Sequence, residues 1–361
     1  MCINGGKKMT YEKNYTFREI MRQPDTWQFI YDEIIENKNF DYNIFKDNYD
    51  EIILFGCGSS YNLSQSAAFL TRYLSKNVTS LALPSSELLL NTDLYFKDNK
   101  KYLVVGFSRS GETTESVNVL KSIKGYKNIK SYTFSCIAGS TFSTLADESY
   151  ICKNAVEKSI VMTESFSSML FAYCTIFAMF MENSDVLDDL KKLIKFVREK
   201  LPSIVDYTSQ YIEKNNFSSY FVLGSDFNYG LAVEADLKMK EMSQVPSYSY
   251  HLYEFSHGPK SLLNENSLCL ILTPNKNLIK YDNKLKEYSE LKTKMLIIGI
   301  KEIKNLKNNQ INYFLQTESF NKDIIKSFIN IPVFQFLAFF KTLKNGLNPD
   351  IPKNLSYTVK I

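Results

Sequence analysis

The sequence predicts an α/β protein of two domains, each a parallel sheet covered by helices on both faces. Apolar segments of strand length alternate with segments of helical periodicity in both halves of the chain, which is the pattern of a three-layer α/β/α sandwich. The length of 361 residues also exceeds that of a usual single domain. We therefore expect each half to have a core of its own.

The composition excludes several classes of protein. A hydrophobic fraction of 44% and a charged fraction of 23% are ordinary for a soluble globular chain. The 43 Lys and Arg residues against 39 Asp and Glu residues leave a net charge of only +4, and no dense basic cluster contains interleaved aromatic residues. We therefore expect no nucleic-acid partner.

Cysteine usage and apolar stretches indicate the compartment. The six cysteines are scattered without metal-binding spacing, which is typical of small buried residues in a reducing compartment. The most apolar stretch, 169–181, has about 13 residues, fewer than the roughly 20 that a membrane span needs. The N-terminus lacks the apolar core of a signal peptide. We expect a cytoplasmic protein with no membrane partner.

Residues 1–40 are expected to form a helical arm, and residues 41–200 the first domain. Apolar residues recur at helical spacing from Phe17 to Asn37 and are interrupted by Pro24, which predicts a helix pair or a kinked helix. The strands of the first domain are expected at 52–55, 78–83, 102–107, 131–136 and 146–155, and its helices at 62–73, near 86, at 113–123 and at 163–183.

The second domain is expected over 201–346, after an amphipathic helical connector at 185–215, and a tail follows at 347–361. Its strands are expected at 219–224, 268–273, 294–300 and 312–315, and its helices at 229–243 and 324–344, the latter long and amphipathic. Gly58-Ser59 and Gly224-Ser225 both follow a first strand, which suggests a duplicated unit.

The stretch from Val104 to Ser116 predicts a strand, a tight loop of small hydroxylated residues and a helix start. The first N–H groups of a helix have no intrahelical acceptor and its dipole end is positive, so an anion can bind there. Side-chain donors for that anion are Ser108, Arg109, Ser110 and Thr113, and a tetrahedral phosphate would use them best. The alternative is that Ser110 or Thr113 only caps the helix.

A second loop of the same kind, Gly56-Cys57-Gly58-Ser59-Ser60, follows the first strand. The carboxyl ends of parallel strands meet at one sheet edge, where ligands bind in such folds. This pairing of loops favours phosphate binding over simple capping. Cys57 could be read as a nucleophile, but between two glycines and without a nearby basic residue it is more typical of packing.

The second half carries candidate acid and base groups. Glu234, Lys238 and Glu241 recur at i, i+4 and i+7, so they share one helix face. On a solvated helix this pattern is an ordinary stabilising ladder. Here the helix begins where a ligand would lie, which leaves a chemical role open.

The two histidines of the chain, His251 and His257, are six residues apart. A metal pair would need a third ligand and usually helical spacing, which this segment does not offer, so we expect no metal. Gly258-Pro259 fixes a turn that would hold the imidazole of His257 in place.

Taken together, these motifs resemble the double SIS (sugar isomerase) domain family, which includes the isomerase half of glucosamine-6-phosphate synthase, aminosugar-6-phosphate deaminases and fructosamine-6-phosphate deglycases. The likeness extends from Arg18 to Leu355. Its motifs, in the family's order and spacing, are Gly56–Ser60, Ser108–Thr113, Glu234–Glu241 and His257–Pro259. The resemblance implies two SIS domains, each a flavodoxin-like sandwich.

The resemblance also implies roles for individual residues. Ser108, Ser110 and Thr113 would bind the sugar phosphate, with Ser59 and Ser60 near the sugar. Glu241 would move a proton between C1 and C2. His257 would assist ring opening and, as in the synthase, would come from the neighbouring subunit of a homodimer. The other candidate substrate-contacting residues are Cys57, Arg109, Glu234, Lys238 and Tyr357.

Three features depart from the synthase. Its glutaminase half has no counterpart, so we do not expect glutamine-dependent synthesis. The tail at 347–361 is expected to lie over the active site, and in it Tyr357 stands where the synthase has the lysine that forms a Schiff base with the sugar, with Lys360 three residues on. Arg109 replaces a glutamine, as in deaminase and deglycase relatives, and a guanidinium would strengthen phosphate binding.

The resemblance leads to a prediction of function. We predict an aminosugar-6-phosphate deaminase/isomerase that opens the sugar, moves a proton through an enediol or enolamine, and releases ammonia and a ketose 6-phosphate. This chemistry needs neither a metal nor an organic cofactor. The alternatives are a fructosamine-6-phosphate deglycase and a non-catalytic phosphosugar-binding regulator.

Overall fold

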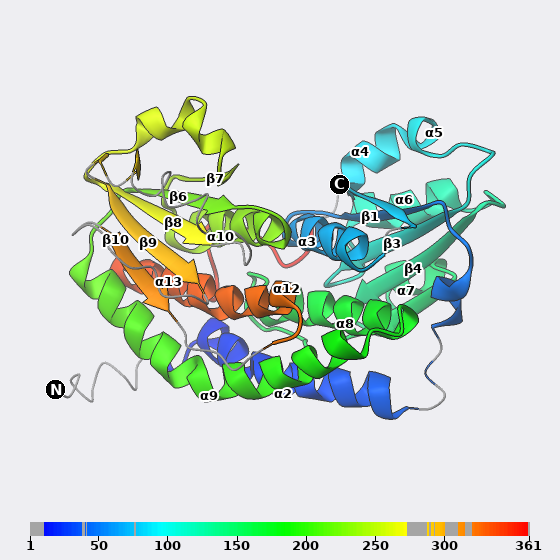
Figure 1. The fold of residues 1–361 in the computed structure, drawn as a ribbon, viewed down its shortest axis with the longest axis horizontal. Coiled ribbons are helices and arrows are strands. Elements are labelled where there is room, and N and C mark those ends of the chain that lie inside the picture. Colours follow the sequence, from blue (N-terminus) through cyan, green and yellow to red (C-terminus); the bar gives the residue numbers. More distant parts are fainter. Residues whose placement is uncertain are drawn as a thin grey trace.

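The computed structural model describes residues 11–359 apart from 38–39, 41, 76, 273–286, 289, 292, 300–309 and 315–319. Two five-stranded sheets form its two halves (Figure 1). The first has the order β2-β1-β3-β4-β5 and the second the order β10-β9-β8-β6-β7. Every described strand pair is parallel.

Both sheets have the same topology. Numbered within its own half, each follows the order 2-1-3-4-5, which is the flavodoxin-like form of the doubly wound fold. The strands of the first are β1 (Glu51–Gly56), β2 (Thr79–Pro84), β3 (Tyr102–Ser108), β4 (Ile129–Ser135) and β5 (Glu148–Ile151). Those of the second are β6 (Ser219–Gly224), β7 (Ser247–His251), β8 (Ser267–Leu272), β9 (Lys294–Gly299) and β10 (Gln310–Phe314). The predicted fold class is confirmed.

Helices cover both faces of the first sheet and, among the described residues, the inner face of the second, whose outer face packs against the 3₁₀ turn Glu254–Ser256 and its neighbours (Figure 1). In the first half they are α3 (Ser59–Leu74), α4 (Ser85–Leu90), α5 (Thr92–Tyr95), α6 (Thr114–Ile123), α7 (Thr141–Leu145) and α8 (Glu164–Phe180). In the second they are α10 (Phe227–Ser243), α12 (Asp323–Lys326) and α13 (Asn330–Lys344). The arm helix α2 (Tyr15–Glu36) and the connector α9 (Ser184–Lys214) run beneath both sheets (Figure 1). The boundary expected at 200/201 lies inside α9.

Two predicted helices differ in the structure. The arm is one helix, α2, with Pro24 inside it, so the predicted helix pair is wrong. Pro24 is buried together with its neighbours Gln23 and Trp27, and this packing outweighs the lost backbone hydrogen bond. The helix expected at 324–344 is divided into α12, a 3₁₀ turn and α13, and α13 is buried on nearly all sides rather than amphipathic.

Two further differences concern strands. β7 was not predicted, because its sequence Ser-Tyr-Ser-Tyr-His is polar and aromatic, and it lies at the edge of its sheet, where half-exposed side chains are tolerated. The predicted strand at 146–155 shortens to β5. The expected strand ends at 273, 300 and 315 lie outside the described residues.

The register of the internal repeat also differs from the prediction. Gly56 ends β1 and Gly224 ends β6, and a helix begins three residues after each. The counterpart of Gly58-Ser59 is therefore Asp226-Phe227, not Gly224-Ser225. The duplicated unit exists, but the literal Gly-Ser match was two residues out of step.

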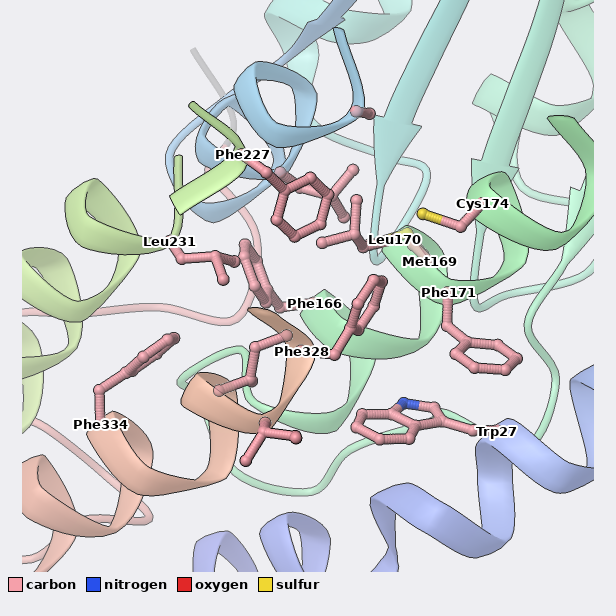
Figure 2. Packing of buried hydrophobic residues seen from close by; sticks show 14 of the residues in the cluster. Trp27, Phe166, Met169, Leu170, Phe171, Cys174, Phe227, Leu231, Phe328 and Phe334 are labelled. Atoms are coloured by element: carbon pink, nitrogen blue, oxygen red, sulfur yellow. The ribbon is translucent and has the colours of Figure 1, made fainter. Parts of the chain in front are cut away.

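The largest hydrophobic cluster is shared by the two halves (Figure 2). Trp27 of α2 stacks on Phe171 of α8 with ring centroids 5.6 Å apart, and its edge contacts Phe328 from the second half at 6.0 Å. Phe328 in turn contacts Phe227 at the start of α10. Two smaller clusters lie on the outer faces of the sheets. The prediction of a separate core for each half is thus only partly right.

Helices α3 and α10 cross at the centre of the molecule, between the two sheets (Figure 1). A Cβ on Gly230 of α10 would lie 2.3 Å from Ser66 Oγ and 2.6 Å from the carbonyl oxygen of Asn62, both on α3. Glycine is therefore required at this crossing, and the close approach joins the chemistry of the two halves.

One described stretch, Asp323–Lys344, is long and apolar enough by composition to cross a membrane. Its most apolar window is 89% buried inside the protein, as expected of a core helix. At 22 residues it is longer than the apolar stretch at 169–181 that the sequence singled out.

Candidate active site

A cleft of about 280 Å³ opens where the two halves meet the tail. Its walls come from the loops after β1 and β3, from the segment 160–162, from the end of α10 and from the tail residues 354–359. The sequence-predicted residues that line it are Cys57, Ser59, Ser60, Arg109, Ser110, Thr113, Glu241 and Tyr357.

The loop after β1 is shaped by two glycines. Gly58 has φ 53° and ψ −125°, a backbone conformation that side chains other than glycine rarely adopt, and space around its missing Cβ is open. A Cβ on Gly56 would lie 2.5 Å from the backbone of Ser60. The turn therefore brings Ser59 and Ser60, the first residues of α3, directly to the cleft.

The loop after β3 is stabilised by hydrogen bonds to its own serine side chains. The N–H of Gly111 donates to Ser108 Oγ at 3.1 Å, and the N–H of Glu112 donates to Ser110 Oγ at 3.2 Å. Ser108 is buried at the strand end and does not line the cleft, so it supports the loop. Thr113 is the residue before α6, and its side chain makes no capping hydrogen bond. The capping alternative is therefore wrong for Thr113, which lines the cleft.

Lys238 lies at the centre of a buried charged cluster that joins α3 to α10. Its Nζ lies 2.5 Å from Glu241 Oε2 and 3.3 Å from Glu234 Oε1, and it donates to Ser59 Oγ at 3.2 Å. Asn62 of α3 donates to Glu234 Oε2 at 2.9 Å. The lysine thus connects the acid/base helix of one half to the hydroxyl loop of the other.

The cluster is not a solvated ladder. The side chains of Glu234 and Lys238 are 0% exposed, whereas that of Glu241 is 21% exposed. Burial raises the pKa of Glu234 to about 7, against the lowering effect of Lys238, while the two carboxylates hold the pKa of Lys238 above its ordinary value despite burial. Only Glu241 of the three lines the cleft, and Lys238 holds its carboxylate in place.

Arg109 does not offer its guanidinium freely to the cleft. Its Nη1 pairs with Glu157 Oε2 at 3.2 Å. Its Nη2 donates to the carbonyl oxygens of Ile160 at 2.7 Å and of Tyr357 at 3.1 Å. The guanidinium carbon also lies 3.9 Å from the centroid of the Tyr357 ring. These contacts differ from the direct phosphate contact that the sequence suggested.

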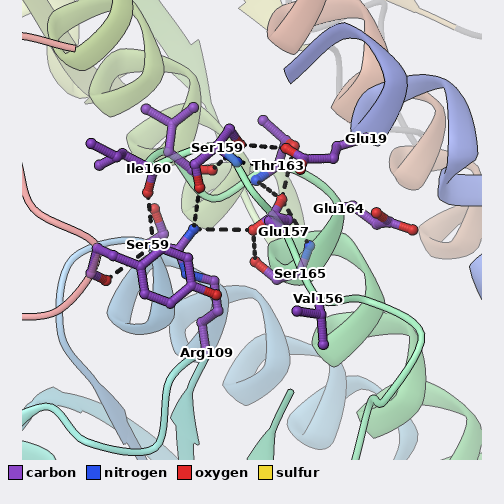
Figure 3. A network of polar contacts seen from close by, with 12 residues as sticks. Glu19, Ser59, Arg109, Val156, Glu157, Ser159, Ile160, Thr163, Glu164 and Ser165 are labelled. Carbon is purple, nitrogen blue, oxygen red and sulfur yellow. Dashed lines mark hydrogen bonds and ion pairs between the residues drawn. The ribbon is translucent and has the colours of Figure 1, made fainter. Parts of the chain in front are cut away.

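Glu157 anchors the segment between β5 and α8 (Figure 3). Its side chain is fully buried and accepts hydrogen bonds from the N–H groups of Thr163 and Ser165, from both of their hydroxyls and from Arg109. Glu19 of α2 binds the same segment through Lys158 N–H and Ser159, and burial raises its pKa. The arm helix, this segment and the cleft are thereby connected.

The two histidines lie outside the cleft of their own chain. His257 is exposed, in the turn before Pro259, and does not line the cleft. His251 stacks on Tyr229 with ring centroids 3.6 Å apart, and burial lowers its pKa. Cys57 lies at the cleft wall with Sγ 3.6 Å from Ser116 Oγ, and burial raises the pKa of its thiol, which fits packing rather than nucleophilic attack.

A family model for the SIS domain matches residues 47–179 and 215–334, which together span more than half of the chain. The chain belongs to the SIS domain family. This match confirms the resemblance found in the sequence, and each matched segment corresponds to one of the two sheets.

Curated relatives and solved structures agree with the SIS assignment. The glutamine–fructose-6-phosphate aminotransferase (isomerizing) of Aquifex aeolicus is 25% identical over 364 residues, covering 97% of this chain and 58% of the relative. A probable glutamine–fructose-6-phosphate aminotransferase (isomerizing) of Acanthamoeba polyphaga mimivirus is 26% identical over 368 residues, covering 97% of this chain and 58% of the relative. The chain thus spans under two thirds of the length of these relatives.

Two solved structures share the fold. The glucosamine-6-phosphate deaminase of Thermotoga maritima has a TM-score of 0.79 at 24% identity, covering 96% of this chain and all of that one (100%). The tagatose-6-phosphate ketose/aldose isomerase of Escherichia coli has a TM-score of 0.83 at 21% identity, covering 95% and 96% of the two chains. At these identities the likeness establishes the double SIS fold.

Sequence reasoning missed four residues of this SIS cleft and its support: Glu115, Glu157, Ile160 and Met162. Glu115 lies in the first turn of α6, within the motif already singled out, so its position could have been recognised. The others belong to 156–165, a segment without periodicity or turn signature. Lys360, considered as a substitute for the synthase lysine, lies outside the described residues; among the described residues no lysine lines the cleft.

Proposed function

We propose that this protein is an aminosugar-6-phosphate deaminase/isomerase that acts without glutamine. The observation that carries the proposal is the convergence of Ser59, Ser60, Ser110 and Thr113 with Glu241 on one cleft. The hydroxyls and the helix start suit a phosphate, and the carboxylate suits proton transfer at the other end of a bound sugar. The likeness to proteins named for phosphosugar chemistry supports the same reading.

The residues suggest an order of events. With the phosphate fixed at the hydroxyl loops, the C1 end of the opened sugar reaches Glu241. Its carboxylate takes the proton from C2 of the aldose while the C1 carbonyl oxygen gains a proton, which gives an enolamine. Return of the proton to C1, with loss of one proton from the amine, gives a ketimine. Water then adds to the ketimine carbon, and ammonia and a ketose 6-phosphate are released. Lys238 positions the carboxylate throughout.

We further propose that the acid for ring opening is His257 of the partner subunit in a homodimer. Within one chain His257 is exposed and lies outside the cleft, so it is available to a neighbour. An imidazole suits this step because its ordinary pKa lies near neutrality.

The proposal is tested by incubating the purified protein with glucosamine 6-phosphate, galactosamine 6-phosphate and fructoselysine 6-phosphate, and measuring ammonia and free amino acid separately. We expect ammonia from an aminosugar phosphate, with turnover about 10²- to 10⁴-fold lower in Glu241→Gln. Glu199→Gln, an exposed glutamate on α9, serves as the matched control. Free lysine instead of ammonia would indicate a deglycase, and binding of all three sugars without any product would favour a regulator.

A further inference from the structure

We infer that Arg109 is a positioning residue for the tail: with Tyr357 it forms a latch that holds residues 354–359 over the cleft. The inference rests on the proposed function, because the covered cleft is the proposed substrate site. It assigns Arg109 to the closing of the site rather than to the phosphate, and Tyr357 to a wall of the site rather than to covalent chemistry.

The latch has a fixed half. Glu157, which pairs with Arg109, is completely buried and its carboxylate accepts hydrogen bonds from two backbone N–H groups and two hydroxyls. The carbonyl oxygen of Ile160 accepts a further bond from the guanidinium at 2.7 Å. A buried charge so fully paired is costly to separate, so Arg109 keeps its place whether or not the tail is closed.

The tail meets Arg109 through fewer contacts. Tyr357 contributes its carbonyl oxygen, 3.1 Å from Nη2, and its ring face, 3.9 Å from the guanidinium carbon. Residues 353–356 are exposed, and the hydroxyl of Ser356 bonds within the tail, to the carbonyl oxygen of Thr358. Among the described residues, Arg109 supplies the hydrogen bond that joins 354–359 to the rest of the protein.

The root of the tail is held independently of this latch. Asp350 accepts hydrogen bonds from the N–H groups of Tyr15 and Thr16 at the start of α2, at 3.0 and 2.8 Å, and from the Thr16 hydroxyl. Its carbonyl oxygen accepts one from the Ile160 N–H at 3.0 Å. The segment between Asp350 and Tyr357 can therefore open at Arg109 while its root stays attached.

Closure by an aromatic side chain has a chemical consequence. Tyr357 occupies a wall of the cleft with a ring and a phenol whose pKa is raised by burial, and it provides no amine for a Schiff base. The latch therefore suits a reaction in which the sugar stays non-covalently bound under a tail that must open for each substrate.

The test compares tail protection with phosphate affinity in the full chain. Hydrogen exchange of the backbone amides of 355–359 is measured by mass spectrometry in the wild type, Arg109→Gln, Tyr357→Ala and Tyr357→Phe. Arg72→Gln is the matched control, since Arg72 also lies near a ring, that of Phe69, and donates to a backbone carbonyl, away from the cleft. Dissociation constants for inorganic phosphate are measured on the same variants.

We expect exchange in 355–359 to rise at least about fivefold in Arg109→Gln and Tyr357→Ala, the factor that corresponds to a cation–π contact of about 1 kcal/mol. Tyr357→Phe keeps the ring and should match the wild type, as should Arg72→Gln. Phosphate affinity should be unchanged in Tyr357→Ala. With glucosamine 6-phosphate, KM should rise more than kcat falls in both latch variants.

Two results would overturn the inference. One is unchanged exchange in Tyr357→Ala, a tail substitution that leaves the folded body intact. The other is a large loss of phosphate affinity in Arg109→Gln with normal tail protection, which would make Arg109 a phosphate ligand. Absence of turnover in the wild type would count against the proposed function alone, because exchange and phosphate binding do not depend on the reaction.

Discussion

The two halves of the molecule share one plan and differ in the loop that leads from their first strand into the next helix. In the first half Gly58 precedes α3 with φ 53° and ψ −125°, and in the second Asp226 precedes α10 with φ 59° and ψ −135°. The same unusual backbone turn is thus kept twice. Around Gly58 the turn is open and lines the cleft, whereas Asp226 carries an exposed carboxyl that interacts electrostatically with His251.

The helices that follow these turns carry different functional groups. α3 begins with small hydroxylated residues at the cleft, whereas α10 carries a buried carboxylate, a buried lysine and the glutamate at the cleft. Their crossing at Gly230 brings Lys238 within hydrogen-bond distance of Ser59. The two equivalent helix starts therefore carry different groups, hydroxyls on α3 and charged side chains on α10, and these groups meet at one place.

The largest effect is expected where the second half completes the site. Glu241→Gln and His257→Ala should each lower turnover by about 10²- to 10⁴-fold, since each removes a proton-transfer group. If the acid comes from the neighbouring subunit, mixed dimers of the two variants contain one site with both groups. We expect co-refolded mixtures to recover up to about a quarter of wild-type activity, as random pairing dictates.

This experiment needs proof that mixed dimers form, for example by two different affinity tags purified in sequence. Doubly tagged dimers without activity would mean that His257 acts elsewhere or that each chain completes its own site. Activity of His257→Ala chains alone would remove the histidine from the mechanism.

The next effect should appear in stability, because the cluster on α10 buries its charges. Lys238→Met leaves Glu234 buried without its cation, and we expect a loss of about 3–5 kcal/mol in the free energy of unfolding. The control is Lys240→Met on the same helix, whose partner Asp236 lies 2.8 Å away but whose own side chain is half exposed. That pair should contribute less than about 1 kcal/mol. Urea denaturation measures both, and equal losses would contradict a special role for the buried cluster.

A third contrast concerns how the arm is attached to the two halves. The arm helix α2 is attached to α8 of the first half through the buried Glu164, which forms an ion pair with Arg22 and accepts a hydrogen bond from the Thr26 hydroxyl. To α13 of the second half it is held by an amide pair, Gln23 to Gln335, at 2.9 Å. Burial raises the pKa of Glu164 to about 7, against the lowering effects of Arg22 and Thr26.

The folded protein binds the proton of the Glu164 carboxyl more tightly than the unfolded chain does. The contribution of the protonated Glu164 to stability is therefore complete below the ordinary carboxyl pKa. It is lost as pH rises through about 7, where the pKa of Glu164 lies in the folded protein. We expect the unfolding free energy to fall by up to about 3 kcal/mol between pH 4.5 and 8. In Glu164→Gln this dependence should shrink, whereas Gln335→Met should keep it. Urea midpoints that change equally with pH in both variants would exclude Glu164 as the source.

Much of this organisation could be predicted from the sequence. Most strands and helices and the two hydroxyl loops follow from local patterns that survive folding, whereas the place of Glu241 at the cleft followed from the family resemblance. The burial of Glu234 and Lys238 could not be predicted, because it depends on the approach of α3 to Gly230, from residues far away in the chain. On a helix alone their spacing is indistinguishable from a solvated ladder.

The contacts of Arg109 could not be predicted for a similar reason. Its partner Glu157 lies 48 residues on, and Tyr357 lies 248 residues on, in segments with no regular pattern. The predicted register of the repeat was wrong because it matched the two Gly-Ser pairs in the sequence instead of aligning the ends of the first strands. When the strand ends are aligned, Asp226 is the counterpart of Gly58, and the two residues have nearly the same backbone angles. At Gly58 and Asp226, conformation rather than residue identity is the property that the two halves have kept.

The smallest effect tests this last point by exchanging the two residues. Asp226→Gly should stabilise the protein by up to about 1 kcal/mol, because glycine adopts this backbone without strain. Gly58→Asp should cost about 1–3 kcal/mol at the same conformation, and its carboxylate would also face the cleft and weaken phosphate binding. Thermal unfolding with and without inorganic phosphate separates the two contributions. If Asp226→Gly were destabilising instead, the interaction of Asp226 with His251 would outweigh the strain, and the second turn would be kept for that interaction rather than inherited from the duplication.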